Sequence, residues 1–291
     1  MVTMIMGEKR RPRPRRDGMS DRSSTHLLEI AAEVVVKRYR SWEYRQPERE
    51  WTALILLDEH VPGTAPMPVS ADLAAAPPTV VMSRLPGLPL SDPVGTEQAA
   101  AVAHTVVQVQ EAIPRTALAS LPPRAGRPAE LLQQVRGWCA EGSSLDASPM
   151  AAKALTEGSQ WLQHPDLADR LAQPGTPVFG TGDGNLANYL LDGSEARLVD
   201  FEYSGLSDRA YELAEMTEHI SVRQHGGTAL VRVLEEVASE EPGASRFTDC
   251  RRLHALFWLL RILNSSQGRS PDGSPILASQ ATRVLELLGQ K

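Results

Sequence analysis

The stretch from Phe179 to Phe201 constrains this chain more than any other. It reads FGTGDGNLANYLLDGSEARLVDF, in which the apolar runs YLL and LV lie on either side of the polar turn DGSEA. Short apolar runs separated by Gly and Asp are typical of a β-hairpin. Because the two ends of a hairpin meet, we expect Asp183 and Asn188, which precede the first run, to lie near Asp200, which follows the second.

Two oxygen ligands beside a third carboxylate match the needs of phosphoryl transfer. Mg²⁺ prefers oxygen donors and takes a few of them from the protein. A separate carboxylate can orient the acceptor hydroxyl and receive its proton, while the metal neutralises charge on the phosphates. Asp183, Asn188 and Asp200 together therefore predict a phosphotransferase centre.

Two other interpretations of this segment need comparison. An EF-hand would use the D-x-N start at Asp183, but Ala187 occupies its third ligand position. In addition, Asn188 replaces the glycine of the turn, and Ser194 stands where the bidentate Glu belongs. The remaining alternative is an ordinary hairpin whose Asp and Asn residues only form turns.

The rest of the chain predicts an α+β protein with two parts. The first part, residues 1–85, combines the β-runs THLLEIAA and EVVVKRY, the helix QPEREWTALILLDEH and the strand in PPTVVMSRLPG. Residues 1–16 are rich in Arg and Pro, and we expect them to be flexible. The second part, residues 86–291, is mostly helical, with helices expected over residues 96–113, 129–141, 149–163, 208–222, 227–240, 246–265 and 275–288, the last capped by Ser274.

A lysine at the end of the second β-run needs a partner if the strand is buried. Lys37 in VVVKRY is that residue. Glu50 in the following helix is one candidate for an ion pair, and Glu48 is the other, because spacing alone leaves the helix face open.

Composition excludes several classes of protein. The formal net charge is −6, which argues against a nucleic-acid-binding surface. The two cysteines, Cys139 and Cys250, are too few for a disulfide framework or a zinc site. No apolar run approaches the ~18–20 residues of a membrane span, and no signal peptide is evident. We therefore expect a cytoplasmic protein that binds neither nucleic acid nor membrane.

The motifs GDGNLAN and LVDFE resemble the catalytic signature of the aminoglycoside phosphotransferase and choline kinase superfamily. The resemblance implies a protein-kinase-like fold, with a small β-rich N-terminal lobe and a larger, mostly helical C-terminal lobe. It also implies that Asp183 is the catalytic base and that Asn188 and Asp200 hold Mg²⁺. The chain departs from the family pattern at Thr181, where a His is expected, and at Glu212, where Asp is usual.

The N-terminal part is similar to the nucleotide-binding lobe of the same family. By this resemblance Lys37, paired with Glu50, positions the phosphates of ATP or GTP. Gly18 and Ser20, in DGMSDRSST, resemble the loop that covers the phosphates. The hinge VVMSRLPG resembles the family's hinge, which implies that the backbone of Met82, Ser83 and Arg84 contacts the base.

The acceptor is predicted as a hydroxylated small molecule, and its charge is an open question. Glu215, Glu218 and His219 share one turn of a helix, and acidic groups there favour a cationic acceptor. Glu202, in DFEY, and Trp258 resemble positions of choline and ethanolamine kinases, where aromatic residues cage a quaternary ammonium. Arg261 would repel such a cation, which favours an aminoglycoside-like antibiotic, and hence antibiotic resistance, or a biosynthetic metabolite.

Two alternatives to this function stay open. A choline- or ethanolamine-type kinase is one, on the similarity of DFEY. A non-catalytic nucleotide-binding regulator is the other, because of Thr181 and the poor glycine loop.

Overall fold

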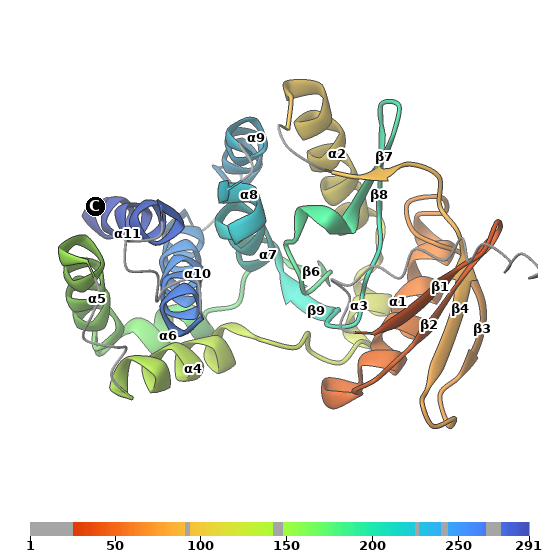
Figure 1. Ribbon diagram of the computed structural model, residues 1–291, viewed down its shortest axis with the longest axis horizontal. Coiled ribbons are helices and arrows are strands. Elements are labelled where there is room, and N and C mark those ends of the chain that lie inside the picture. The colour runs from red at the N-terminus through yellow and green to blue at the C-terminus, as the bar shows by residue number, and fades with distance from the viewer. Residues whose placement is uncertain are drawn as a thin grey trace, which may run out of the picture.

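An antiparallel sheet of four strands forms the N-terminal end of the protein in its computed structural model (Figure 1). The structure describes residues 26–90, 94–141, 148–224, 227–239, 244–265 and 275–290. The strands are β1 (Leu27–Ile30), β2 (Val34–Arg38), β3 (Pro68–Asp72) and β4 (Thr79–Ser83), in the order β1-β2-β4-β3. Residues 1–16 and the predicted Gly18, Ser20 and Ser274 lie outside the described residues.

One helix, α1 (Gln46–His60), packs against this sheet on β3 and β4. Pro47 lies in its first turn, where a missing backbone N–H costs nothing. Leu54 and Leu57 are fully buried, and each contributes roughly 1.5–3 kcal/mol of burial energy. This packing fixes the face of α1 that carries Glu50.

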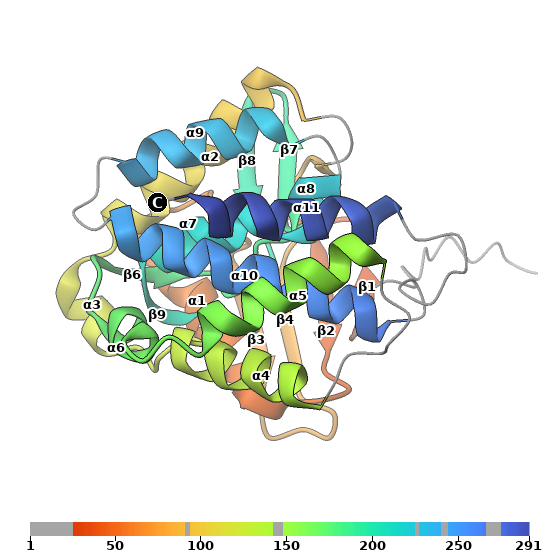
Figure 2. The same cartoon turned by 90° about the vertical axis from the view of Figure 1, so that its left-hand side faces the viewer.

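The C-terminal lobe is mostly helical. Several of its helices lie side by side at the end of the molecule away from the sheet (Figures 1 and 2). They contact one another through α10, which packs on α4, α7 and α11. The helices are α2 (Thr96–Ala112), α3 (Arg115–Ala119), α4 (Pro128–Ala140), α5 (Pro149–Leu162), α6 (Leu167–Ala172), α7 (Arg209–Glu218), α8 (Ile220–Gln224), α9 (Thr228–Ser239), α10 (Ala244–Asn264) and α11 (Pro275–Gly289).

Short strands lie between the sheet and these helices (Figure 1). The predicted hairpin is formed by β7 (Tyr189–Asp192) and β8 (Glu195–Leu198), and β5 (Leu88–Pro89) pairs with β7. Tyr189 lies opposite Leu198, so the ends of the hairpin meet as predicted. The strand β6 (Pro177–Gly180) lies outside the hairpin and pairs with β9 (Gly205–Asp208).

One predicted helix is wrong in its extent. The sequence predicts a single helix over residues 208–222, but Asp208 ends β9 and caps α7 by accepting a hydrogen bond from the Tyr211 amide. The helix stops at Glu218, and His219 adopts an extended ψ of 136° before α8 begins. The imidazole Nδ1 of His219 accepts a hydrogen bond from the Ser221 amide, which stabilises the break.

The architecture is the α+β, two-lobed, protein-kinase-like fold that the sequence predicts. The boundary after residue 85 stays a prediction. Within the described residues, no helix has the length and apolar character needed to cross a membrane.

Candidate active site

A tight loop between β6 and β7 carries Asp183 and Asn188. Gly182 has a φ of +84°, and a Cβ at this position would lie 2.5 Å from the carbonyl of Tyr203. Only glycine therefore allows the loop to approach the chain that follows β8 so closely. The Asn188 amide donates a hydrogen bond to Asp183 Oδ2 at 3.3 Å, and the Asn185 backbone N–H donates to Asp183 Oδ1 at 3.0 Å.

Asp200 follows β8 at the same end of the hairpin. Its φ is +71°, in the left-handed region that Asp tolerates better than most residues, at a cost of about 1–3 kcal/mol. The neighbouring Val199 amide donates to the Asn188 carbonyl at 3.0 Å, which joins the two ends of the hairpin. The strained conformation presents the carboxylate of Asp200 to Lys37, 2.5 Å away.

Lys37 lies at the centre of three carboxylates. Its Nζ contacts Glu50 at 3.0 Å, Glu202 at 2.8 Å and Asp200. The side chain is 5% exposed. Burial alone would lower the pKa of Lys37, but the carboxylates of Glu50 and Asp200 outweigh it and raise this pKa well above its usual range. The lysine is therefore fully protonated.

Glu50, not Glu48, is the helix partner of this lysine. Glu48 forms a surface ion pair with Arg45 at 3.5 Å. Glu50 also accepts a hydrogen bond from the Phe201 amide at 3.0 Å. A single carboxylate of α1 thus fixes both Lys37 and the segment that follows Asp200.

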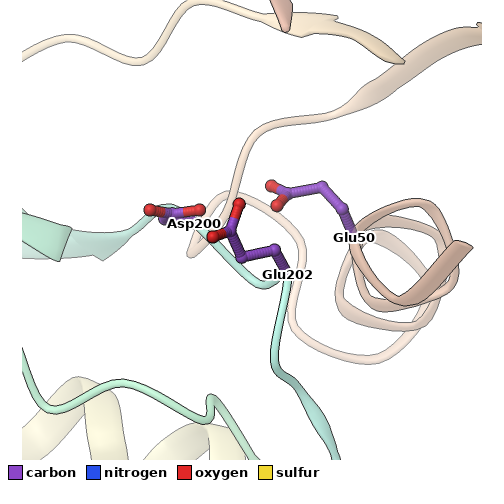
Figure 3. A group of neighbouring side chains, drawn as sticks. All are labelled: Glu50, Asp200 and Glu202. Atoms are coloured by element: carbon purple, nitrogen blue, oxygen red, sulfur yellow. The ribbon is translucent and has the colours of Figure 1, made fainter. Parts of the chain in front are cut away.

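One carboxylate oxygen from each of Glu50, Asp200 and Glu202 lies within 4.8 Å of the other two, and the three side chains converge from two parts of the chain (Figure 3). Three converging carboxylates could hold a cation, and the Lys37 ammonium is the cation among them. His26 Nε2 also contacts Glu202, at 2.8 Å. Burial opposes ionisation of Glu202, but hydrogen bonds from His26 and Lys37 lower its pKa to about 2. The cluster is the counter-ion shell of Lys37.

An oxygen-donor set that fits Mg²⁺ lies beside this cluster. The Asp200 side chain is 41% exposed and gives only Oδ1 to Lys37. The Asn188 side chain uses its nitrogen on Asp183, and its oxygen accepts no hydrogen bond from the described part of the chain. Hard oxygen donors such as these suit Mg²⁺.

The environment of Asp183 makes it a stronger base than an ordinary aspartate. Burial, then the negative charges of Glu215 and Asp200, raise the pKa of Asp183 to about 6. At neutral pH the group is therefore mostly ionised yet has a higher proton affinity than usual. These are the properties needed to receive a proton from an acceptor hydroxyl.

The imidazole of His219 contacts the carboxylate of Asp183. Burial, only partly offset by Glu215, lowers the pKa of His219 to about 4, so the imidazole is neutral. Its Nδ1 accepts the Ser221 amide hydrogen at 3.2 Å, which places the ring proton on Nε2. That Nε2 lies 3.4 Å from Asp183 Oδ1. Ser221 Oγ in turn accepts a hydrogen bond from the Leu186 amide, in the loop that carries Asp183 and Asn188.

Arg124 is a buried residue of this site that sequence reasoning missed. Its guanidinium contacts Glu212 at 2.8 Å and Glu215 at 2.5 Å, and donates to the Gly182 carbonyl at 3.1 Å. It therefore holds the loop residue directly before Asp183. Arg124 lies in the irregular segment LPPRAGRP, where no spacing rule indicates a partner 88 to 91 residues away.

The residues predicted to bind the acceptor lie in different parts of the structure. His219 and Trp258 lie together, with ring centroids 4.7 Å apart, and Arg261 covers the Trp258 ring at 5.4 Å. Glu202 lies on the lysine side, in contact with the ammonium. Glu218 is fully buried and is bound by arginines of α10 and α11.

The predicted hinge lies at the end of β4. The Ser83 amide donates to the Met67 carbonyl and the Arg84 amide to the Glu33 carbonyl, both at 2.9 Å. Met82 is buried in the sheet. These two amides are therefore used by the sheet, and a contact between this hinge and a base, which stays a prediction, must use other backbone groups.

Both the sequence and the fold resemble those of known proteins. A sequence profile of the family described as "Phosphotransferase enzyme family" matches residues 13–262. No curated protein matches the chain by sequence. Among solved structures, a choline/ethanolamine kinase family protein from Mesorhizobium loti aligns with a TM-score of 0.62 and 16% identity over 92% of this chain and 86% of its own.

Two aminoglycoside phosphotransferases are also similar in structure. A thermostable mutant of APH(4)-Ia, in ternary complex with ADP and hygromycin B, aligns with a TM-score of 0.61 and 14% identity over 92% of each chain. The GDP complex of an aminoglycoside 2′-phosphotransferase IIIa mutant aligns with a TM-score of 0.57 and 17% identity over 91% of this chain and 87% of its own. At these identities the likeness shows the fold.

Proposed function

The chain belongs to the phosphotransferase enzyme family, and from that premise we propose that it moves the γ-phosphate of ATP or GTP, with Mg²⁺, to a hydroxyl of a small molecule. One observation carries the proposal. Lys37 of the N-terminal sheet contacts Asp200, 163 residues later, at the end of the hairpin where Asp183 and Asn188 also meet. A cationic anchor, oxygen ligands and a tuned base therefore share one site.

Nucleotide binding is assigned to Lys37. The ammonium is protonated, rigidly held and surrounded by more negative charge than it neutralises. Phosphate oxygens would replace part of this shell, because a positive lysine attracts them as a point charge. Glu50 keeps Lys37 in place by its second bond, to the Phe201 amide.

The metal is assigned to Asn188 and Asp200. When bound, Mg²⁺ neutralises charge on the phosphates and orients them. Asp200 offers the exposed half of its carboxylate, and Asn188 offers its amide oxygen.

Proton transfer is assigned to Asp183. The acceptor hydroxyl gives its proton to the Asp183 carboxylate as its oxygen forms a bond to the γ-phosphorus. The bond between that phosphorus and the bridging oxygen breaks, and the nucleoside diphosphate leaves with the electron pair. The hydrogen bond from Asn188 orients the carboxylate during this step.

Calorimetric titration with Mg-ATP and Mg-GTP tests the nucleotide site. Lys37→Arg keeps the charge but not the shape of the ammonium, so we expect at least about tenfold weaker binding. Asp200→Asn should weaken binding of the Mg complex more than binding of the metal-free nucleotide. Lys153→Arg is the matched control, because Lys153 pairs only with Glu157 on the surface of α5, within the described part of the chain.

Binding that is equal in Lys37→Arg, Lys153→Arg and the wild type would contradict this assignment. Circular dichroism of each variant must first show the native helix content, because loss of a buried ion pair can unfold a protein.

A further inference from the structure

Three aromatic side chains form a continuous surface between α4 and α10. Trp138 stacks on Phe257 with ring centroids 5.5 Å apart, and Phe257 meets Trp258 edge-to-face at 5.3 Å. We call these three residues the aromatic shelf. All three are only partly buried, so the shelf presents ring surface to solvent.

The aromatic shelf adjoins the catalytic base through one residue. His219 packs edge-to-face on Trp258 with ring centroids 4.7 Å apart, and its Nε2 lies 3.4 Å from Asp183 Oδ1. Trp258 and Asp183 are therefore both in contact with the same imidazole, which places the aromatic shelf beside the proposed base.

A positive charge lies over the Phe257 and Trp258 end of the aromatic shelf, the end that adjoins His219. The guanidinium of Arg261 lies 5.4 Å from the Trp258 ring centroid and 5.8 Å from that of Phe257. Arg261 is exposed, and no carboxylate of the described residues pairs with it. Contact with these two rings restricts the guanidinium, while its N–H donors have no carboxylate partner among the described residues.

The acidic residues Glu215 and Glu218, which predicted a cationic acceptor, are already held by arginines of the protein. Glu215 is paired with Arg124, which is itself buried. Glu218 is 0% exposed and contacts Arg251 and Arg283, each at 2.7 Å. Neither carboxylate has the freedom to bind an ammonium group of a substrate.

We infer that the acceptor is a hydroxylated molecule with an anionic group, such as a carboxylate, and an aromatic or similarly flat apolar portion. This inference rests on the proposed function and names its acceptor class. The hydroxyl meets Asp183, the anionic group pairs with Arg261, and the flat portion packs on the ring surface of the aromatic shelf that Arg261 and His219 leave exposed. The same arrangement disfavours polycationic aminoglycosides and quaternary ammonium compounds, because Arg261 repels them.

Three matched probes test the charge preference without knowledge of the natural acceptor. They are 3-phenyllactate, 3-phenyl-1,2-propanediol and phenylalaninol, which share a phenyl ring and a hydroxyl and differ in carrying an anionic, neutral or cationic group. Binding to the full chain, saturated with a non-hydrolysable Mg-nucleotide, is followed by tryptophan fluorescence and calorimetry. We expect 3-phenyllactate to bind at least about tenfold more tightly than phenylalaninol, the scale of one charge-assisted hydrogen bond.

Variants of Arg261 connect this preference to the residue. Arg261→Gln should remove the advantage of 3-phenyllactate and leave binding of the diol unchanged, and Arg261→Lys should retain part of it. Arg232→Gln is the matched control, since Arg232 is an exposed arginine of α9 that is also unpaired among the described residues. Loss of the preference in Arg261→Gln alone supports the inference.

Three results overturn it: 3-phenyllactate binds no more tightly than phenylalaninol, Arg261→Gln keeps the full preference, or Arg232→Gln loses it equally. The nucleotide titration in the same samples separates this failure from failure of the proposed function. Normal Mg-nucleotide binding without a charge preference contradicts only the acceptor class. Absence of nucleotide binding contradicts the proposed function itself.

Discussion

Asp183→Asn should make the protein more stable at neutral pH while it removes the catalytic base. Burial and the neighbouring carboxylates raise the pKa of Asp183 to about 6, from 3.8 for an unperturbed group. A tenfold change in proton affinity corresponds to about 1.4 kcal/mol, which gives an upper bound of about 3 kcal/mol for the cost of ionised Asp183. The side chain is 32% exposed, so solvent screening reduces this cost, and we expect a gain of about 1–2 kcal/mol.

The sign of the effect fixes its pH dependence. Because the pKa of Asp183 is higher in the folded state than in the unfolded state, its protonated form stabilises the fold at pH values below the unfolded pKa of 3.8. This stabilisation is lost as the pH rises through the folded pKa of about 6. An Asn side chain at position 183 does not ionise, so its contribution to stability does not fall as the pH rises. The stability difference between Asp183→Asn and the wild type should therefore be largest at pH 7.5, and about two thirds of it should disappear at pH 4.5.

Urea denaturation at the two pH values measures this difference directly. The matched control is Asp58→Asn, at an exposed position on the same chain, in α1. A gain that is independent of pH, or that appears equally in Asp58→Asn, would refute the electrostatic explanation. A variant that is less stable than the wild type at pH 7.5 would refute it as well.

Three further predictions concern the same loop. Gly182→Ala should destabilise the protein by more than about 1 kcal/mol and reduce turnover, because the φ of residue 182 is +84° and an Ala Cβ there would meet Tyr203. Urea denaturation measures the loss of stability, and a coupled assay measures the loss of turnover. The exposed Gly289→Ala is the control. Arg124→Met should cost about 3–5 kcal/mol of unfolding free energy, since it leaves Glu212 and Glu215 buried without their cation; equal stability would contradict this role. The catalytic rate should rise with pH through about 6 as Asp183 ionises, and a kcat/KM profile that is flat from pH 5 to 8 would exclude Asp183 as the base.

The sequence predicted the centre of this site because local rules determine most of it. The DGSEA turn and its flanking apolar runs define the hairpin, and a hairpin brings Asn188 to Asp200 by its own geometry. A lysine in a buried strand requires a counter-ion, which limited its helix partner to Glu48 or Glu50. The choice between these two required packing of α1 on the sheet, which periodicity alone did not determine.

The missed residues make contacts between distant segments without a regular pattern. Arg124 lies in a proline-rich loop and reaches Gly182 and Glu215, and no local signal indicates these contacts. No glycine or proline marks the break in the helix at His219. The helical spacing of apolar residues therefore predicted one continuous helix across this position. That break moves Glu218 into the core and turns His219 toward Asp183, which changes the expected charge of the acceptor site.

Transfer of the γ-phosphate is the central claim, and ³¹P NMR measures it most directly. The wild type and Asp183→Asn are incubated separately with Mg-ATP or Mg-GTP and a panel of hydroxylated acceptors, sorted by charge. We predict a new phosphoester resonance with the wild type and a rate at least about 100-fold lower with Asp183→Asn, although this variant still binds the nucleotide. An equal amount of phosphoester formed by both proteins would contradict the account.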